Sequence, residues 1–174
     1  FPNLALVVVL GTDQSLFSAD FRATERLYQQ LLQVSGRPGR GEKKGQVLLQ
    51  TEFSQHPVYQ SLIHQTFDEF AQNLLTERED AAFPPYCYQV LLKVAAKQER
   101  NIWNFLSLAQ KEAVEIKVSG IEVYDAVPSP LFKMSGFYRG QLLIQASSRK
   151  SMRGFLRVWR TRIDGLKDNT VRYV

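Results

Sequence analysis

Apolar residues in the first fifty positions gather into short runs separated by polar loops. Residues 4–10 form a continuous apolar, β-branched run, which is typical of a buried strand, and residues 46–50 predict a second strand. Between these strands, apolar residues recur at helical spacing, at Leu27, Leu31 and Val34. Because Ser18 or Asp20 can cap the start, we expect a helix from there to about residue 34.

A second apolar stripe predicts one continuous helix over residues 57–78, with Pro57 in its first turn, where proline is favoured. Its apolar face consists of Val58, Leu62, Ile63, Phe67, Phe70 and Leu74. The run Phe83-Pro84-Pro85 ends the helical pattern, because proline lacks a backbone donor and restricts the residue before it. We interpret residues 56–85 as a connector between two bodies.

From residue 86 onward, strand and helix patterns alternate. The predicted order is a strand at 88–95, a helix at 98–113, a strand at 116–124, a proline-containing loop, a strand at 138–145, a helix at 149–163 and a strand at 170–174. This order predicts a small α+β domain with its helices on one face of a four-stranded sheet. The whole chain is expected to be of the α/β (α+β) class, in three parts: residues 1–55, 56–85 and 86–174.

Charge and cysteine content narrow the class of protein. A net charge of +5, with a pI near 9.4, favours an anionic partner such as nucleic acid. The single cysteine, Cys87, excludes an internal disulfide and fits a reducing, cytoplasmic setting. The histidines have no cysteine partners, which argues against a metal site. No run is long enough to span a membrane, and both ends are expected to be cuts in a longer protein.

The predicted helix at 149–163 has two different faces when its residues are placed about 100° apart. Its apolar face consists of Met152, Phe155, Leu156, Trp159 and Ile163. Its basic face consists of Arg149, Arg153, Arg157 and Arg160, and Lys150 and Arg162 are expected to extend the charge. Since surface helices usually mix signs, the basic face indicates a site for DNA phosphates or for an acidic peptide. An ordinary exposed basic helix is the alternative. Tyr138 and Arg139 on the preceding strand are candidates to add stacking and charge, and packing in the sheet is the alternative for Tyr138.

Residues 33–40, Gln-Val-Ser-Gly-Arg-Pro-Gly-Arg, place two arginines at the end of the first predicted helix. The glycines, Gly36 and Gly39, let the backbone turn closely. The guanidinium groups of Arg37 and Arg40 suit phosphate, and Gln33 can add a hydrogen bond. A solvated turn is the alternative. The position of the loop between a helix and a strand favours a clamp for a triphosphate, whose charge grows in the transition state.

Residues 33–40 resemble motif VI of superfamily 2 helicases. Residues 16–26, Leu-Phe-Ser-Ala-Asp-Phe-Arg-Ala-Thr-Glu-Arg, resemble the segment before it in the bacterial primosomal protein N′ (PriA) family. The resemblance continues through the segments 45–51, 56–57, 83–85, 136–139 and 142–149. It covers nearly the whole chain and is densest over residues 1–55.

This resemblance implies a role for each of the three parts. Residues 1–55 would be the end of the second RecA-like helicase lobe, residues 56–85 a connecting helix and proline-rich linker, and residues 86–174 a C-terminal domain with a ribosomal-protein-S10-like fold. The ATP-binding positions implied in motif VI are Gln33, Gly36, Arg37 and Arg40. Of these, Arg40 would be the principal catalytic arginine finger, assisted by Arg37.

The resemblance also implies a function for the parent protein. That protein would be an ATP-dependent 3′-to-5′ DNA helicase of the bacterial cytoplasm, which restarts stalled replication forks and assembles the primosome. Implied partners are forked or single-stranded DNA, the acidic C-terminal tail of single-stranded DNA-binding protein (SSB), and other primosomal proteins. The resemblance implies a tail-binding role for Arg149 and Arg153. The pattern of the helix and of the preceding strand adds Arg157, Arg160 and Arg139 to the expected DNA- or tail-binding residues. ATP and Mg²⁺ belong to the intact parent and zinc to its cysteine-rich region, so no cofactor is expected in this chain.

Two departures limit what the chain can do alone. It carries no Gly-Lys-Ser/Thr phosphate loop and no acidic Mg²⁺-binding pair. Because an arginine finger needs a bound nucleotide, this chain alone is not expected to hydrolyse ATP. Residues 125–128, Asp-Ala-Val-Pro, also differ from the Gly-Pro expected there. The alternative, from another class, is a stand-alone basic module that binds nucleic acid or protein without ATP-linked activity.

Overall fold

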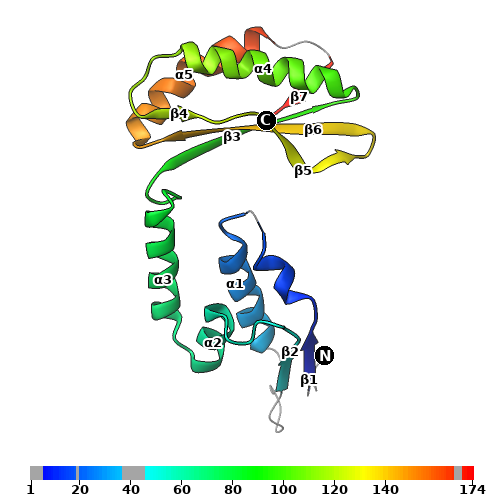
Figure 1. The fold of residues 1–174 in the computed structure, drawn as a ribbon, viewed down its shortest axis with the longest axis vertical. Coiled ribbons are helices and arrows are strands. Elements are labelled where there is room, and N and C mark those ends of the chain that lie inside the picture. The colour runs from blue at the N-terminus through cyan, green and yellow to red at the C-terminus, as the bar shows by residue number, and fades with distance from the viewer. Residues whose placement is uncertain (1–5, 19, 37–45, 167–169) are drawn as a thin grey trace. The chain divides into compact units, whose positions relative to one another are not determined.

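The structure is a computed structural model that describes residues 6–18, 20–36, 46–166 and 170–174. The chain divides into two compact units, Phe1–Glu77 and Arg78–Val174. Both mix helices with strands, as the sequence predicts (Figure 1). Among the described helices, none has the length and apolar character needed to cross a membrane.

The first unit is built around a parallel pair of strands. β1 (Leu6–Val9) pairs with β2 (Gln46–Leu49), and the short 3₁₀ helix η1 (Thr12–Ser15) and α1 (Ala23–Ser35) lie between them in sequence. Two further helices, α2 (Pro57–His64) and α3 (Phe67–Asp80), follow. The core consists of Leu27, Tyr28, Leu31, Val58, Tyr59 and Phe70. The predicted order of strand, helix and strand is confirmed.

The strand at residues 4–10 was expected to be buried, and this prediction is wrong for the described part. Along β1, half-buried residues alternate with exposed ones, so that Leu6 and Val8 are 47% and 53% exposed. Leu48, the register partner of Val8, is also exposed. Val9 and Leu49, on the opposite face, pack against the core. Only one face of this strand pair is covered, so burial alternates from one residue to the next. The sequence does not show this alternation, because every residue in the run is apolar.

The single helix predicted over residues 57–78 is two helices. Gln65 ends α2 in the left-handed region at φ 58°, and the Thr66 amide donates 3.1 Å to the Ser61 carbonyl. A left-handed residue after the last helical turn is a common way for a helix to end. Apolar residues recur at helical spacing both before and after this turn, so the sequence pattern predicts one continuous helix in place of two.

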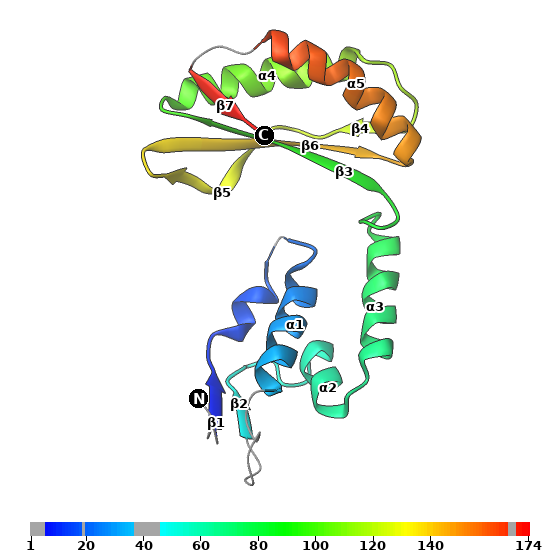
Figure 2. The same cartoon turned by 180° about the vertical axis from the view of Figure 1, so that it is seen from behind.

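The second unit is an antiparallel sheet with two helices on one face, as Figures 1 and 2 show from opposite sides. The central strands are β3 (Tyr88–Ala96) and β6 (Phe137–Ala146), and β7 (Val171–Tyr173) pairs with β3. Along its other edge, β6 pairs with β4 (Ile121–Val123) and with β5 (Val127–Met134). The covering helices are α4 (Glu99–Glu115) and α5 (Arg149–Gly165).

The four-stranded prediction for this sheet is wrong, because the sheet has five described strands. All of β5 lies within the residues predicted as a proline-containing loop. Proline is tolerated on an edge strand, and the register of β5 shifts between Pro128 and Lys133. The strand predicted over 116–124 contracts to Ile121–Val123, because a turn with Gly120 at φ 74° separates it from the end of α4 at Glu115.

The helical layer lies close to the sheet at one glycine. A Cβ added to Gly140 would lie 2.7 Å from Leu106 Cδ1 and 2.8 Å from Ile102 Cγ2, so α4 packs where this strand has no side chain. The two helices are also joined to each other. The buried Trp159 indole of α5 donates 2.9 Å to the Ala109 carbonyl of α4.

Candidate functional site

The first candidate site is the end of α1. Gln33 is exposed on the last helical turn, and the Gly36 amide donates to the Leu32 carbonyl at 3.3 Å. Gly36 has φ −79°, a conformation open to any residue, so its predicted need for glycine is not seen. The two arginines of the predicted clamp, Arg37 and Arg40, and Gly39 lie outside the described residues.

A hydrogen-bond network holds the loop after β1 against the end of β2. The Asp13 carboxylate accepts from Thr51 Oγ1 at 2.5 Å, from the Glu52 amide at 2.9 Å and from Tyr59 Oη at 2.9 Å. The Tyr59 hydroxyl also bonds Thr12 Oγ1 at 2.8 Å. The Thr51 hydroxyl, and then the Glu52 amide, lower the pKa of Asp13 below its ordinary value. The network therefore favours the charged carboxylate.

One of the two histidines and the single cysteine take structural positions. His56 caps α2, where its Nδ1 accepts from the Val58 amide at 3.2 Å. Partial burial lowers the pKa of His56, so this acceptor nitrogen stays unprotonated near neutral pH. His64 is exposed. Cys87 is buried, and its burial raises the pKa of the thiol, which disfavours the reactive thiolate.

The second candidate site is the predicted basic face of α5. Arg149, Arg153, Arg157 and Arg160 are all exposed, and Met152, Phe155, Trp159 and Ile163 are buried beneath them. The helix begins at Ser148, whose Oγ accepts from the Ser151 amide at 3.1 Å. Its first turn holds no acidic residue, so cations stand at the positive end of the helix dipole. This placement costs stability in isolation and strengthens the local positive field.

Two cations predicted to support the basic face do not lie on it. Arg162 turns toward α4, where its Nη1 lies 2.9 Å from Glu112 Oε2 and 3.5 Å from Glu115 Oε2. Arg139 belongs to the other face of the sheet, because its neighbour Gly140 points at α4 and side chains alternate along a strand. Arg160 stays on the basic face, where its Nε lies 4.0 Å from Asp164 Oδ2.

Sequence reasoning missed the residues that share the face of Arg139. Arg172 pairs in register with Ala95, which also pairs with Arg139, and Lys93 lies two residues before Ala95. The Arg172 guanidinium lies over the Phe137 ring, 5.2 Å from its centroid. The alternation of polar and apolar residues over 137–146 could have shown that Arg139 faces away from the core. The pairing of β3 with β7, which places Arg172 beside it, cannot be read from the sequence.

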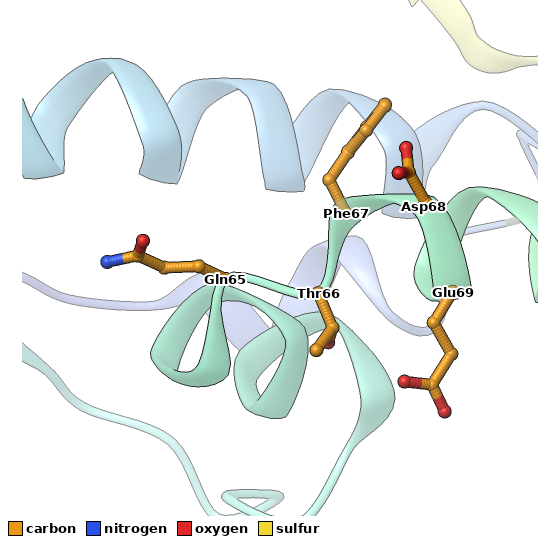
Figure 3. A pocket seen from close by; sticks show the side chains of 5 residues that line it. All are labelled: Gln65, Thr66, Phe67, Asp68 and Glu69. Atoms are coloured by element: carbon orange, nitrogen blue, oxygen red, sulfur yellow. The ribbon is translucent and has the colours of Figure 1, made fainter.

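Neither a hollow nor a metal cluster adds a further site. A shallow, open hollow of about 310 Å³ is lined by Gln65, Thr66, Phe67, Asp68 and Glu69. Figure 3 shows that these side chains diverge, so they converge on no common ligand. Among the described residues, no group of three or more His, Cys, Asp or Glu side chains is placed to hold a metal ion.

Comparison with known proteins identifies the class of this sheet-and-helix unit. Residues 79–172 match the family model described as the primosomal protein N C-terminal domain. The chain therefore belongs to the PriA family, as its resemblance to primosomal proteins implies.

The relatives are replication restart proteins from diverse bacteria. The replication restart protein PriA of Haemophilus influenzae is 38% identical over 157 residues, which are 90% of this chain and 22% of the relative. The PriA proteins of Synechocystis sp. and Bacillus subtilis are 34% and 31% identical over 84% and 90% of the chain. The chain spans 18–22% of the length of these relatives.

Proposed function

We propose that this chain is part of an ATP-dependent 3′-to-5′ DNA helicase that restarts stalled replication forks and assembles the primosome. Within it, the C-terminal unit binds an anionic partner, either DNA or the acidic tail of SSB, through the basic face of α5. The observation that carries this proposal is the set of four exposed arginines on one face of a helix whose opposite face is fully committed to the core. The role in replication restart is supported by the relatives, which are named replication restart protein PriA.

The geometry favours a binding face over a merely solvated one. The four arginines fall within an arc of about 80° on a helix of about 100° per residue. At close spacing they repel each other, and within the described residues their one ion pair is the 4.0 Å contact of Arg160 with Asp164. Arg162, by contrast, is neutralised by two glutamates of α4. An unneutralised stripe is stabilised when phosphates or carboxylates bind it.

The test replaces Arg149, Arg153, Arg157 and Arg160 by Gln and measures binding of labelled fork DNA over a salt series. Each lost phosphate contact should flatten the plot of log affinity against log salt by about 0.9. The control is Arg100→Gln, an exposed cation on α4. A second titration uses an acidic, phenylalanine-ended peptide, for which we expect Arg149→Ala to weaken binding. Unchanged binding of both partners by the fourfold variant would refute the role of the basic face.

For the first unit, we propose that residues 1–55 are the end of the second RecA-like lobe and that Gln33, Gly36, Arg37 and Arg40 belong to its ATP site. The support is a parallel strand pair connected through α1, as α/β lobes have, and the exposure of Gln33 at the end of that helix. The negative end of the α1 dipole repels phosphate. The arginines that follow must therefore supply the attraction.

In a full-length family member that carries this chain, Arg40→Ala should reduce DNA-stimulated ATP hydrolysis by roughly 10³-fold, the lower bound for an arginine finger. Fork binding should stay within twofold, because the finger meets the nucleotide and not the DNA. The control is Arg26→Ala, whose side chain pairs with Asp20 at 2.8 Å on the outer surface of the first unit. Unchanged hydrolysis in Arg40→Ala would favour the alternative of a basic module that does not use ATP.

A further inference from the structure

We infer that the helix-free face of the C-terminal sheet is a second site, which binds single-stranded DNA by combining phosphate contacts with base stacking. This surface, the open sheet face, consists of outward residues of β3, β6 and β7, including Lys93, Ala95, Phe137, Arg139 and Arg172. The inference deepens the proposed function and rests on its DNA-bound setting. The site lies on the opposite layer from the basic face of α5.

The direction of these side chains follows from fixed neighbours. Gly140 points at α4, so Arg139 and Gln141 point away from the helices. Tyr173 stacks on Phe105 of α4 with centroids 5.2 Å apart, so its neighbour Arg172 points the other way. Lys93 lies between the buried residues Leu92 and Val94. In Figures 1 and 2, α4 and α5 both lie on the other side of this sheet.

The cations of the open sheet face gather at one end of it. The carboxylate that β4 adds to this face, Glu122, is the register partner of Gln145, six residues along β6 from Arg139. The described residues of the open sheet face on β3, β6 and β7 include three cations and no carboxylate, and they are Gln89, Leu91, Lys93, Ala95, Phe137, Arg139, Gln141, Leu143, Gln145 and Arg172. Within the described part of the chain, no ion pair within 4.0 Å involves Lys93, Arg139 or Arg172. Three cations without neutralising partners complement a chain of phosphates.

The cations are spaced by the register of the sheet. Arg139 and Arg172 are both register partners of Ala95, on the strands to either side of it. Neighbouring strands are about 4.8 Å apart, so the two arginines stand about 10 Å apart. The side chain of Ala95 is only a methyl group, so it does not fill the space between the two arginines. A phosphate backbone crossing the strands can therefore contact both guanidinium groups.

An aromatic platform adjoins this pair and favours an unpaired strand over a duplex. The planar guanidinium of Arg172 lies over the Phe137 ring, with Cζ 5.2 Å from the centroid. An arginine held on an aromatic ring presents a flat cationic surface on which a base can stack. Bases in a duplex already stack on each other, so only an unpaired base can use this surface.

The test measures binding of the 174-residue chain to labelled oligo(dT) and to a duplex of equal length, by fluorescence anisotropy over a salt series. The variant Arg139→Gln/Arg172→Gln should weaken oligo(dT) binding about tenfold and flatten its salt slope by about 1.4, since each phosphate contact on a single strand contributes about 0.7. Phe137→Leu should weaken oligo(dT) binding severalfold with an unchanged slope. Duplex binding should change less than twofold in both variants.

The matched control, Arg100→Gln/Lys111→Gln, removes two exposed cations from α4 and should leave both ligands unaffected. Oligo(dT) binding that survives the loss of Arg139 and Arg172 would overturn the inference. So would an equal loss for duplex, or an acidic peptide that competes for the open sheet face as well as oligo(dT) does. The fourfold α5 variant separates the two proposals, because its failure to affect DNA leaves the open-face result standing.

Discussion

The two units differ in the size of their apolar cores and in how many polar contacts support them. The C-terminal unit closes a cluster between a five-stranded sheet and two helices, with Ile102, Leu106, Leu142, Ile144 and Phe155 fully buried. The first unit has a smaller cluster and leaves one face of its strand pair exposed. It adds a polar network in which the buried Tyr59 hydroxyl meets Thr12 and Asp13. We conclude that apolar packing dominates in one unit and that hydrogen bonds carry a larger share in the other.

The largest effect should come from the core of the C-terminal unit. Phe155→Ala removes a fully buried ring that lies 5.5 Å from the Trp159 ring, and should lower the free energy of unfolding by about 3–5 kcal/mol. Hydrogen exchange should show lost protection along β6 and little change in α1. Equal losses in β6 and α1 would contradict the view that the two cores are separate.

A middle-sized effect is expected from the polar network of the first unit. Tyr59→Phe keeps the buried ring and removes its hydroxyl, so the free energy of unfolding should fall by about 1–2 kcal/mol. Chemical denaturation followed by exchange of α1 and α2 amides measures the change. The control is Tyr124→Phe, because the exposed Tyr124 side chain donates its hydroxyl to the exposed Glu122 carboxylate at 3.0 Å. A Tyr59→Phe chain as stable as the parent would show that the first unit does not depend on this network.

The smallest effect concerns pH. The pKa of Asp13 is lowered from 3.8 by its hydrogen bonds, so its charged form stabilises the folded state above the ordinary value. This contribution is lost as the pH falls from 3.8 through the lowered folded value. Asp13→Asn should therefore reduce stability at pH 7, and the difference from the parent should shrink below pH 3.8. Thermal melts at both pH values measure it, and a difference independent of pH would exclude the carboxylate charge as its cause.

Local patterns allowed most helices and strands to be predicted. The two faces of α5 followed from helical spacing, and its arginines are exposed as expected. Two features escaped because they depend on contacts distant in sequence. The edge position of β5 makes its prolines tolerable, and the pairing of Arg172 and Arg139 with Ala95 creates the open sheet face. Arg162 was misassigned because its partners, Glu112 and Glu115, lie on another helix.

The positions of the two tryptophans determine what tryptophan fluorescence can report about unfolding. Both tryptophans of the chain, Trp103 and Trp159, belong to the C-terminal unit. Trp159 is 2% exposed and bonded to the Ala109 carbonyl, whereas Trp103 is half-buried and donates 3.2 Å to Glu99. Tryptophan fluorescence during denaturation therefore observes one core and is blind to the other. A single smooth emission curve would say nothing about whether α1 and its neighbours had already unfolded.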